Sequence, residues 1–207
     1  MKQDDKYLLI AATGNQGKVK EIKAVLADLP FCLKTAAEVG FTDEVAEDGL
    51  SFAANALKKA QAVHRHCPQA YVLADDSGLC IDALGGAPGL YSARFGGVET
   101  GYKDKFALLY DLLKEVDPAD RTARFLCAIA VVRPDGSYFT TQGLFEGRIA
   151  DRPAGQGGFG YDPIFFVPAY QKTSAELTAA EKNACSHRGK ALAKAVARLQ
   201  LELPFDH

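Results

Sequence analysis

Two adjacent aspartates, Asp75 and Asp76, are the side chains of this sequence best suited to chemistry. They follow an apolar run, Tyr71 to Ala74, that is typical of a short buried strand, and Ser77 and Gly78 come directly after them. Neighbouring carboxylates repel each other, and burying them unpaired is costly. A divalent cation such as Mg²⁺ would remove that cost, because one or two carboxylates and substrate phosphates usually hold it. A solvated turn explains the same residues, so this stretch alone leaves both interpretations open.

A second chemical stretch runs from Thr13 to Lys18, between an apolar run at 7–11 and a helical pattern that begins at Val19. A strand, a glycine-rich turn and a helix often hold phosphate, because free backbone N–H groups and the helix dipole face the anion. Lys18 would add a point charge and Asn15 an amide donor. The spacing is not that of a Walker A loop, which needs four residues between its first glycine and Gly-Lys. A generic strand-to-helix turn is the alternative.

A third stretch, Gly155 to Gly160, has the formal spacing G-x-G-x-x-G. We reject a dinucleotide site, because no buried strand precedes the stretch and Tyr161 to Pro163 follows it in place of a helix. A glycine-rich loop still lets backbone approach a ligand. A nucleobase could stack on Phe159 or Tyr161, which would contribute about 1–3 kcal/mol. Packing of either ring into the core explains it equally well.

The elements that must position these stretches alternate between strands and helices. Helices are expected at 51–66, 105–116 and 191–199, from apolar residues at helical spacing. Ser51 or Asp48 would cap the first of these, and capping also explains the acidic cluster of Glu44, Glu47 and Asp48. A strand at 124–132 followed by Asp135-Gly136 predicts a hairpin that returns over 137–144.

The end of the chain carries a further group of basic residues. A capping box, Thr178 to Glu181, opens the last helical region. Lys182, His187 and Arg188 follow, near a turn at Gly189. Solvation of a helix surface explains Lys182, and the His-Arg pair is weak evidence for a site by itself.

Composition limits the possible functions of the 207 residues. Apolar residues make up 48% and charged residues 24%, as in ordinary globular proteins, and the net charge of −2 provides no global field for nucleic acid. No apolar run approaches the ~20 residues of a membrane span, and the first residues do not form a signal peptide. Five scattered cysteines form no Cys-x-x-Cys pair, so we expect reduced thiols and a cytoplasmic protein.

Taken in order, five stretches resemble the inosine triphosphate pyrophosphatase family. They are Thr13 to Lys18, Ala74 to Gly78, Leu84 to Gly89, Gly157 to Pro163 and Ser186 to Gly189. The resemblance covers nearly the whole chain and is greater to the bacterial members, the non-standard purine NTP pyrophosphatases or dITP/XTP diphosphatases. It implies hydrolysis of ITP, dITP and XTP to the monophosphate and pyrophosphate with Mg²⁺. It also implies a single elongated α/β domain, residues 1–207, in which a long mixed sheet is flanked by helices and two lobes enclose the active-site cleft, and usually a homodimer.

The resemblance also implies roles for individual residues. Asp76 would be the proton acceptor and a metal ligand, and Glu47 and Asp75 would complete the acidic metal region. Phosphates would be held by Thr13, Gly14, Asn15, Gln16, Gly17 and Lys18, helped by Lys59 and Ser77. Nucleoside and base would be surrounded by Phe159, Gly160, Tyr161, Asp162, Lys182, His187 and Arg188. Asp48 departs from the bacterial pattern, and an extra carboxylate beside Glu47 could alter metal affinity.

Base choice has a separate logic. Inosine and xanthosine carry an oxygen at position 6, where adenosine carries an amino group, so buried donors such as Arg188 would favour the oxygen. Mismatches of this kind can reach 10⁴–10⁵-fold. Two other functions stay open: a nucleotide phosphatase or pyrophosphatase of other base specificity, and a module that binds nucleotides without cleaving them. The paired aspartates argue against the second, because an anion site gains nothing from carboxylates unless a metal is present.

Overall fold

The computed structural model describes residues 7–27 and 29–203. Its sheet has seven strands in the order β2-β1-β3-β4-β5-β6-β7. The strands are β1 (Tyr7–Ala11), β2 (Phe31–Thr35), β3 (Tyr71–Ile81), β4 (Thr122–Val132), β5 (Tyr138–Ile149), β6 (Phe165–Val167) and β7 (Lys172–Thr173). The helices are α1 (Gln16–Val25), α2 (Phe52–His66), α3 (Tyr102–Leu112), α4 (Ala179–Cys185) and α5 (His187–Glu202). Strand β1 pairs in parallel with β2 and β3, whereas β6 pairs antiparallel with β5 and β7, so the predicted mixed α/β sheet is confirmed.

The chain folds as two compact units. Unit 1 contains the described residues up to Asp76, together with Cys127–Gly143 and the described residues from Arg188 onward. Unit 2 contains Ser77–Leu126 and Leu144–His187. The elongated shape and the cleft between two lobes stay predictions.

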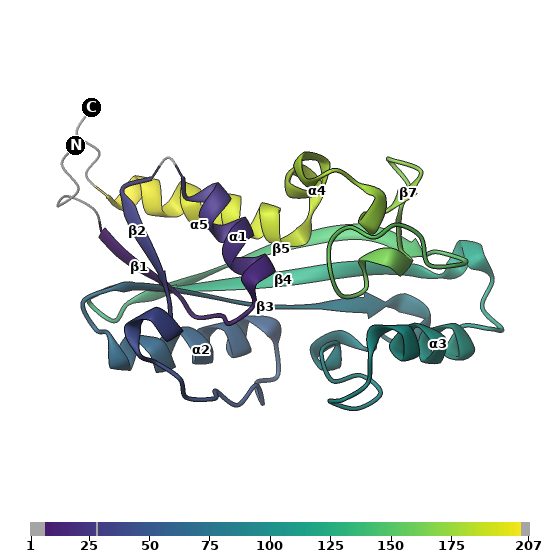
Figure 1. Ribbon diagram of the computed structural model, residues 1–207, viewed down its shortest axis with the longest axis horizontal. Coiled ribbons are helices and arrows are strands. Elements are labelled where there is room, and N and C mark those ends of the chain that lie inside the picture. The colour runs from purple at the N-terminus through teal and green to yellow at the C-terminus, as the bar shows by residue number, and fades with distance from the viewer. Residues whose placement is uncertain (1–6, 28, 204–207) are drawn as a thin grey trace. The chain divides into compact units, whose positions relative to one another are not determined.

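In unit 1, helices cover both faces of the strands (Figure 1): α1 and α5 lie on one face and α2 on the other. The alternation of strand side chains produces this arrangement, because consecutive residues point to opposite faces. Leu9 and Leu73 belong to the core cluster that contains Ile22 of α1 and Leu192 of α5. The intervening residues, such as Ile10, belong to the α2 cluster. That second cluster is rich in alanine, with Ala56, Ala60, Ala70, Ala74 and Ala130.

Unit 2 has its own core, built from residues of β3, α3, β4, β5 and the segments around β6. Phe165, Ile164, Leu79 and Leu109 are fully buried there. Phe125 and Phe145 pack against Phe165, with ring centroids 4.6 and 5.1 Å away. Strands β4, β5 and β6 therefore meet at a group of three phenylalanine rings.

Several local predictions are confirmed. Ser51 caps α2 by accepting a hydrogen bond from the Ala54 N–H, and Thr178 and Glu181 form the capping box of α4. The Asp135-Gly136 turn joins β4 to β5, and the Arg133 N–H donates to the Ser137 carbonyl at 2.8 Å.

Some predicted boundaries are wrong. The helix predicted at 105–116 lies at Tyr102–Leu112, and the strand expected to end before Asp75 continues to Ile81. The buried side chains Leu79 and Ile81 carry β3 past the polar residues, because burial in unit 2 outweighs their preference for a turn.

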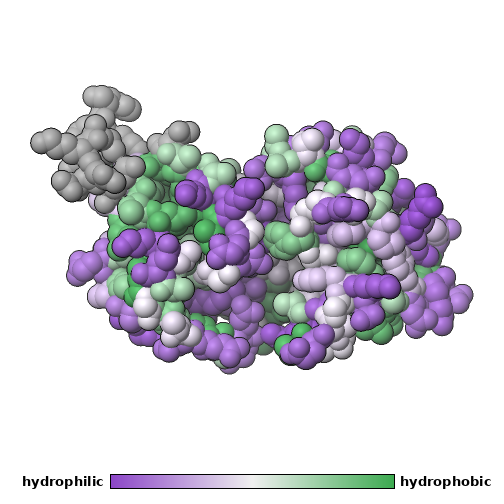
Figure 2. All heavy atoms as spheres, viewed as in Figure 1, coloured by the Kyte–Doolittle hydropathy of each residue, from purple (hydrophilic) through white to green (hydrophobic). Residues whose placement is uncertain are grey.

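The surface matches the composition. Figure 2 shows hydrophilic side chains over most of the visible face, with apolar ones in smaller groups, as is usual for a folded chain. Among the described residues, no helix combines the length and the apolar character that a membrane span would need.

Candidate active site

Strand β3 carries both aspartates, and its alternation separates them. Asp75 lies two residues after Leu73, on the same face of the strand, and faces α1 and α5. Asp76 lies on the opposite face, with Val72 and Ala74, and faces α2. Both side chains are buried. The two carboxylates therefore contact different helices, although the charge of Lys59 also acts on Asp75 and that of Lys18 on Asp76.

The α2-side cluster consists of Asp76, Glu47, Lys59 and Asn55. The Lys59 ammonium lies 2.7 Å from Glu47 Oε1 and 3.7 Å from Asp76 Oδ1, so it bridges the two carboxylates. Asn55 lies four residues before Lys59 on α2, and its Nδ2 donates to Asp76 Oδ2 at 3.0 Å. Its Oδ1 accepts from the Gly49 N–H at 2.7 Å. Asn55 thus connects Asp76 with the loop that bears Glu47.

Burial and charge set the protonation of this cluster. Burial raises the pKa of Asp76 above its ordinary value, and nearby Glu47 adds to the rise, although Lys59 and Asn55 oppose it. Burial by itself would lower the pKa of Lys59, yet Asp76 and Glu47 raise it. Lys59 is therefore a firmly charged counter-ion, and Asp76 binds a proton more readily than an ordinary aspartate does.

The α1-side cluster consists of Asp75, Lys18, Arg188 and Glu21. Asp75 Oδ2 accepts from Lys18 Nζ at 3.0 Å and from Arg188 Nε at 3.1 Å. A second guanidinium nitrogen of Arg188, Nη1, donates to Glu21 Oε2 at 2.8 Å. Burial would raise the pKa of Asp75, but the charges of Lys18 and Arg188 hold it well below its ordinary range. Asp75 is therefore ionised throughout the physiological range.

Among the described residues around β3, Glu47 and Asp76 on the α2 side fit a divalent cation. Glu47 and Asp76 supply the carboxylate oxygens that Mg²⁺ prefers, and with one ammonium between them they leave one net negative charge. In residues 7–27 and 29–203, no three His, Cys, Asp or Glu side chains gather closely enough to hold a metal. The assignment of Asp75 to the metal region stays a prediction, although strand alternation directs its side chain to the other face.

The predicted phosphate turn is the start of α1. The helix begins at Gln16, earlier than the pattern indicated, and Asn15 caps it by accepting from the Lys18 N–H at 3.1 Å. Asn15 therefore acts through its amide oxygen, and its own N–H donates to Thr13 Oγ1. Residues 14–17 are exposed. Because first-turn N–H groups have no intrahelical partner, those of Gln16 and Gly17 point to where an anion can bind.

In unit 2, Asp162 organises the glycine-rich loop. Its Oδ2 accepts from the Phe159 N–H at 2.8 Å and from Lys182 Nζ at 2.6 Å, and its Oδ1 accepts from Ser174 Oγ at 2.8 Å. Gly158 has a φ of +71°, and a Cβ there would lie 2.1 Å from Asp162 Oδ2, so only glycine fits. Lys182 also lies 5.1 Å from the Phe159 ring centroid.

Two aromatic predictions resolve differently. The Phe159 side chain is 39% exposed and can offer a face to a base. Tyr161 cannot: it is buried, its hydroxyl donates to the Ser92 carbonyl at 2.8 Å, and Tyr102 packs edge-on against it at 5.3 Å. The core interpretation is therefore correct for Tyr161, and its place on the stacking surface is corrected.

The other predicted residues have mainly supporting positions. His187 is buried and stacks on Phe125 at 4.8 Å, within unit 2. Ser77 is half-buried in β3. Gly160 has a φ of +67° and lies against the Tyr102 ring, where a Cβ would meet the Tyr102 hydroxyl at 3.5 Å.

Sequence reasoning missed Asn55, Glu21 and Ser174, which hold predicted site residues in place. Asn55 offered a signal, because an amide at four-residue spacing from Lys59 shares its helix face. Glu21 offered no signal, because a single acidic residue on a helix is ordinary. Ser174 lies twelve residues from its partner Asp162, and no local pattern connects the two.

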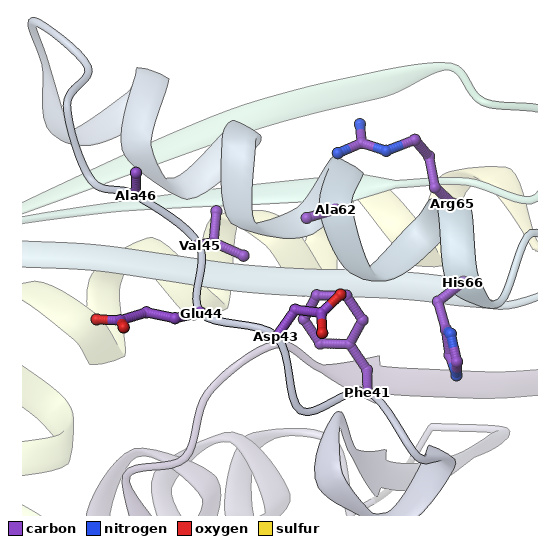
Figure 3. A pocket seen from close by; sticks show the side chains of 8 residues that line it. All are labelled: Phe41, Asp43, Glu44, Val45, Ala46, Ala62, Arg65 and His66. Atoms are coloured by element: carbon purple, nitrogen blue, oxygen red, sulfur yellow. The ribbon is translucent and has the colours of Figure 1, made fainter.

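A separate pocket lies elsewhere in unit 1 (Figure 3). Its volume is about 460 Å³, between the 41–46 loop and the last turns of α2. Its wall is partly fixed, because His66 Nε2 lies 3.0 Å from the Val39 carbonyl and its ring meets Phe41 edge-on. None of the lining residues is a predicted site residue, although Ala46 immediately precedes Glu47.

Comparison with known proteins agrees with the resemblance drawn from the motifs. The model of the Ham1 family matches residues 9–198. The chain is 49% identical over 185 residues to a Bacillus subtilis protein named dITP/XTP pyrophosphatase, covering 89% of this chain and 93% of the relative. A Desulforamulus reducens protein of the same name is 50% identical over 189 residues, which cover 91% and 93%.

A solved structure agrees as well. A HAM1 protein from Coxiella burnetii superposes with a TM-score of 0.87 at 38% identity, covering 94% of this chain and 98% of that one. The family match spans most of the chain, and the curated relatives exceed 45% identity over nine-tenths of it. The chain therefore belongs to the Ham1 family.

Proposed function

We propose that this chain hydrolyses non-standard purine nucleoside triphosphates (ITP, dITP and XTP) to the nucleoside monophosphate and pyrophosphate. The observation that carries the proposal is the identity of about half of the aligned residues to relatives named dITP/XTP pyrophosphatase. The α2-side cluster supports it, because two carboxylates around one ammonium are an unusual feature for a site that only binds anions. Such a reaction would remove deaminated purines from the nucleotide pool.

Glu47 and Asp76 would hold a Mg²⁺ ion, since their carboxylates face the same side of β3. When bound, the ion would act as a Lewis acid that stabilises charge on the phosphate oxygens. Asn55 would keep Asp76 in place during this process, because its amide is fixed at both ends. Lys59 would help to neutralise the triphosphate.

Asp76 would accept a proton from the attacking water. The water oxygen bonds to the α-phosphorus, the bond to the bridging oxygen breaks, and pyrophosphate leaves. The raised pKa of Asp76 suits this task, since a base holds a proton better when its pKa approaches the working pH. The first turn of α1, with the Lys18 ammonium, would hold the phosphates through N–H groups and charge.

The base would be recognised by unit 2. Phe159 would stack on it, and Lys182 would donate a hydrogen bond to its 6-oxygen. An ammonium carries donors only, so it would be mismatched against the 6-amino group of adenine. The hypothesis that Arg188 reads the base is less favoured, because Arg188 donates to Asp75 and Glu21 and is buried. We give His187, which stacks on Phe125, a supporting role too.

A panel of nucleoside triphosphates with and without Mg²⁺ tests the function. We expect ITP, dITP and XTP to yield monophosphate and pyrophosphate, at a kcat/KM far above that for ATP, and EDTA to stop the reaction. Release of orthophosphate would instead indicate a phosphatase. Binding without turnover would indicate a nucleotide-binding module, and equal kcat/KM for ITP and ATP would defeat the proposed base selection.

We propose two further properties that accompany this function. The first is a homodimer, which light scattering of the purified chain would test. The second is a cytoplasmic location, where the substrates of such an enzyme arise, and which cell fractionation would test.

A further inference from the structure

We propose that Asp75 is a positioning residue that holds Lys18 for the substrate phosphates and takes no part in binding the metal. The proposal rests on the proposed function, since it concerns how the same site is prepared for a triphosphate. It differs from the expectation that Asp75 and Asp76 act together. Four observations on the α1-side cluster carry it.

The first is the direction of the side chain. Asp75 and Asp76 are consecutive in β3, so their carboxylates leave the strand on opposite faces. Asp76 meets Asn55 and Lys59, both from α2, whereas Asp75 meets Lys18 of α1 and Arg188 of α5. The backbone of β3 thus lies between Asp75 and the carboxylates that fit a cation.

The second is charge balance. Asp75 and Glu21 contribute two negative charges, and Lys18 and Arg188 contribute two positive ones, so the cluster is neutral. On the α2 side, the Lys59 ammonium lies between the Glu47 and Asp76 carboxylates. To reach Asp75, a divalent cation would have to compete with two cationic groups that already contact its carboxylate.

The third is closure of the cluster. Lys18 and Glu21 lie three residues apart on α1. Lys18 contacts Asp75, Asp75 contacts Arg188, and Arg188 contacts Glu21, so the contacts form a closed ring on one turn of α1. This arrangement fixes the first turn of α1 against β3. The Gln16 and Gly17 N–H groups belong to that same turn. Ordering them before substrate arrives avoids part of the entropy cost of binding.

The fourth is that the two oxygens of the Asp75 carboxylate differ in their contacts. Oδ2 accepts from both cations, while Oδ1 is buried and has no hydrogen-bond partner among the described residues. In the described part of the chain, Asp75 is thus held by the two charged contacts at Oδ2. The side chain of Lys18 stays 17% exposed, which lets its ammonium meet a phosphate without leaving Asp75.

A double-mutant cycle on ITP hydrolysis tests the positioning role. Asp75→Asn should raise KM for ITP by about 10- to 100-fold, the range for one charge-assisted hydrogen bond, while the Mg²⁺ concentration for half-maximal rate changes less than twofold. In a Lys18→Met background the same substitution should change KM less than twofold, because Asp75 acts through Lys18. Additive effects, or a parallel rise in the Mg²⁺ requirement, would overturn the proposal.

A binding experiment tests the proposal without measuring turnover and without requiring that the Asp75→Asn variant folds. Calorimetric titration with Mn²⁺ should show at least tenfold weaker binding for Glu47→Gln and Asp76→Asn. Lys18→Met should bind Mn²⁺ as the unmodified chain does. If Asp75 were a metal ligand, removal of its ammonium partner would tighten Mn²⁺ binding, and that result would refute the proposal.

Titration with inorganic pyrophosphate separates this inference from the proposed function. Lys18→Met and Asp75→Asn should both weaken pyrophosphate binding, while Asp111→Asn, which removes an exposed carboxylate of α3, should not. If the chain binds pyrophosphate in this Asp75-dependent way yet cleaves no nucleotide, the proposed function fails and the positioning role stands. If Asp75→Asn leaves the affinity for pyrophosphate unchanged, the positioning role is refuted, whether or not the chain cleaves nucleotides.

Discussion

The two faces of β3 place identical, adjacent side chains in opposite electrostatic settings. On the α1 face, Oδ2 of Asp75 contacts two cations, and the pKa of Asp75 is lowered. On the α2 face, Asp76 shares one ammonium with Glu47, and burial raises its pKa. One backbone step therefore separates a permanently charged carboxylate from one that can exchange a proton. The comparison teaches that adjacency in sequence is a poor guide to a shared role inside a strand.

The two faces of β3 also differ in the size of the side chains that pack on them. Leucine and isoleucine fill the α1 and α5 face, while alanine dominates the α2 face. Small side chains let α2 approach the strands closely, so Asn55 and Lys59 come within reach of Asp76. The alanine-rich core and the polar cluster of the α2 face thus depend on each other.

The largest expected effect is on catalysis. Asp76→Asn should lower kcat for ITP by about 10²–10⁴-fold, because the base that accepts the proton is lost. The fold should persist, since the substitution removes a charge that burial disfavours and keeps an acceptor for Asn55. Steady-state kinetics and thermal unfolding check this. Near-normal kcat would remove Asp76 from the mechanism and with it the functional contrast between the faces.

For stability, we expect substitution of Asp75 to have a larger effect than substitution of Asp76. Asp75→Asn should lower the free energy of unfolding by about 3–5 kcal/mol at pH 7, because it leaves the buried charges of Lys18 and Arg188 short of a partner. Asp76→Asn should leave that free energy unchanged or raise it. Urea unfolding of both variants measures the difference, and Asp111→Asn serves as an exposed control. Equal losses at positions 75 and 76 would contradict the comparison.

A packing change on the α2 face should have an intermediate effect. Ala60 is fully buried, so Ala60→Leu should cost about 1–3 kcal/mol by overpacking. By displacing α2 it should also raise the Mg²⁺ concentration needed for half-maximal rate. Ala107→Leu on the exposed face of α3 is the matched control and should change stability by less than about 0.5 kcal/mol. An unchanged Mg²⁺ requirement would show that the alanine packing does not set the metal side.

The smallest effect is expected where α5 ends. Glu202 bonds Arg133, and the hydrogen bonds from Arg133 lower its pKa below the ordinary value. Its contribution is therefore present above the unfolded pKa of about 4.3 and is lost as pH falls through the folded pKa. Glu202→Gln should cost less than about 1 kcal/mol at pH 7 and less again at pH 3. Urea unfolding at both pH values checks this, and a cost independent of pH would exclude the ionic explanation.

Local chemistry made much of the fold predictable. The helix at Phe52–His66, the hairpin turn at Asp135-Gly136 and the capping box at Thr178 all follow from short patterns. The family was predictable too, because its five motifs occur along the chain in their usual order. The boundary errors lie where tertiary burial overrides local preference, as in β3, whose polar centre looked like a turn.

The amino-acid sequence by itself determined the family, the alternation of strands and helices, and which residue types are available for phosphate and metal chemistry. Only the tertiary structure decided which of them meet. Glu21 and Arg188 lie far apart in the chain, as do Asn55 and Asp76, yet each pair is in hydrogen-bond contact. The physical reason is that a strand sends successive side chains to opposite faces, and the helix packed on each face decides which charges they find there.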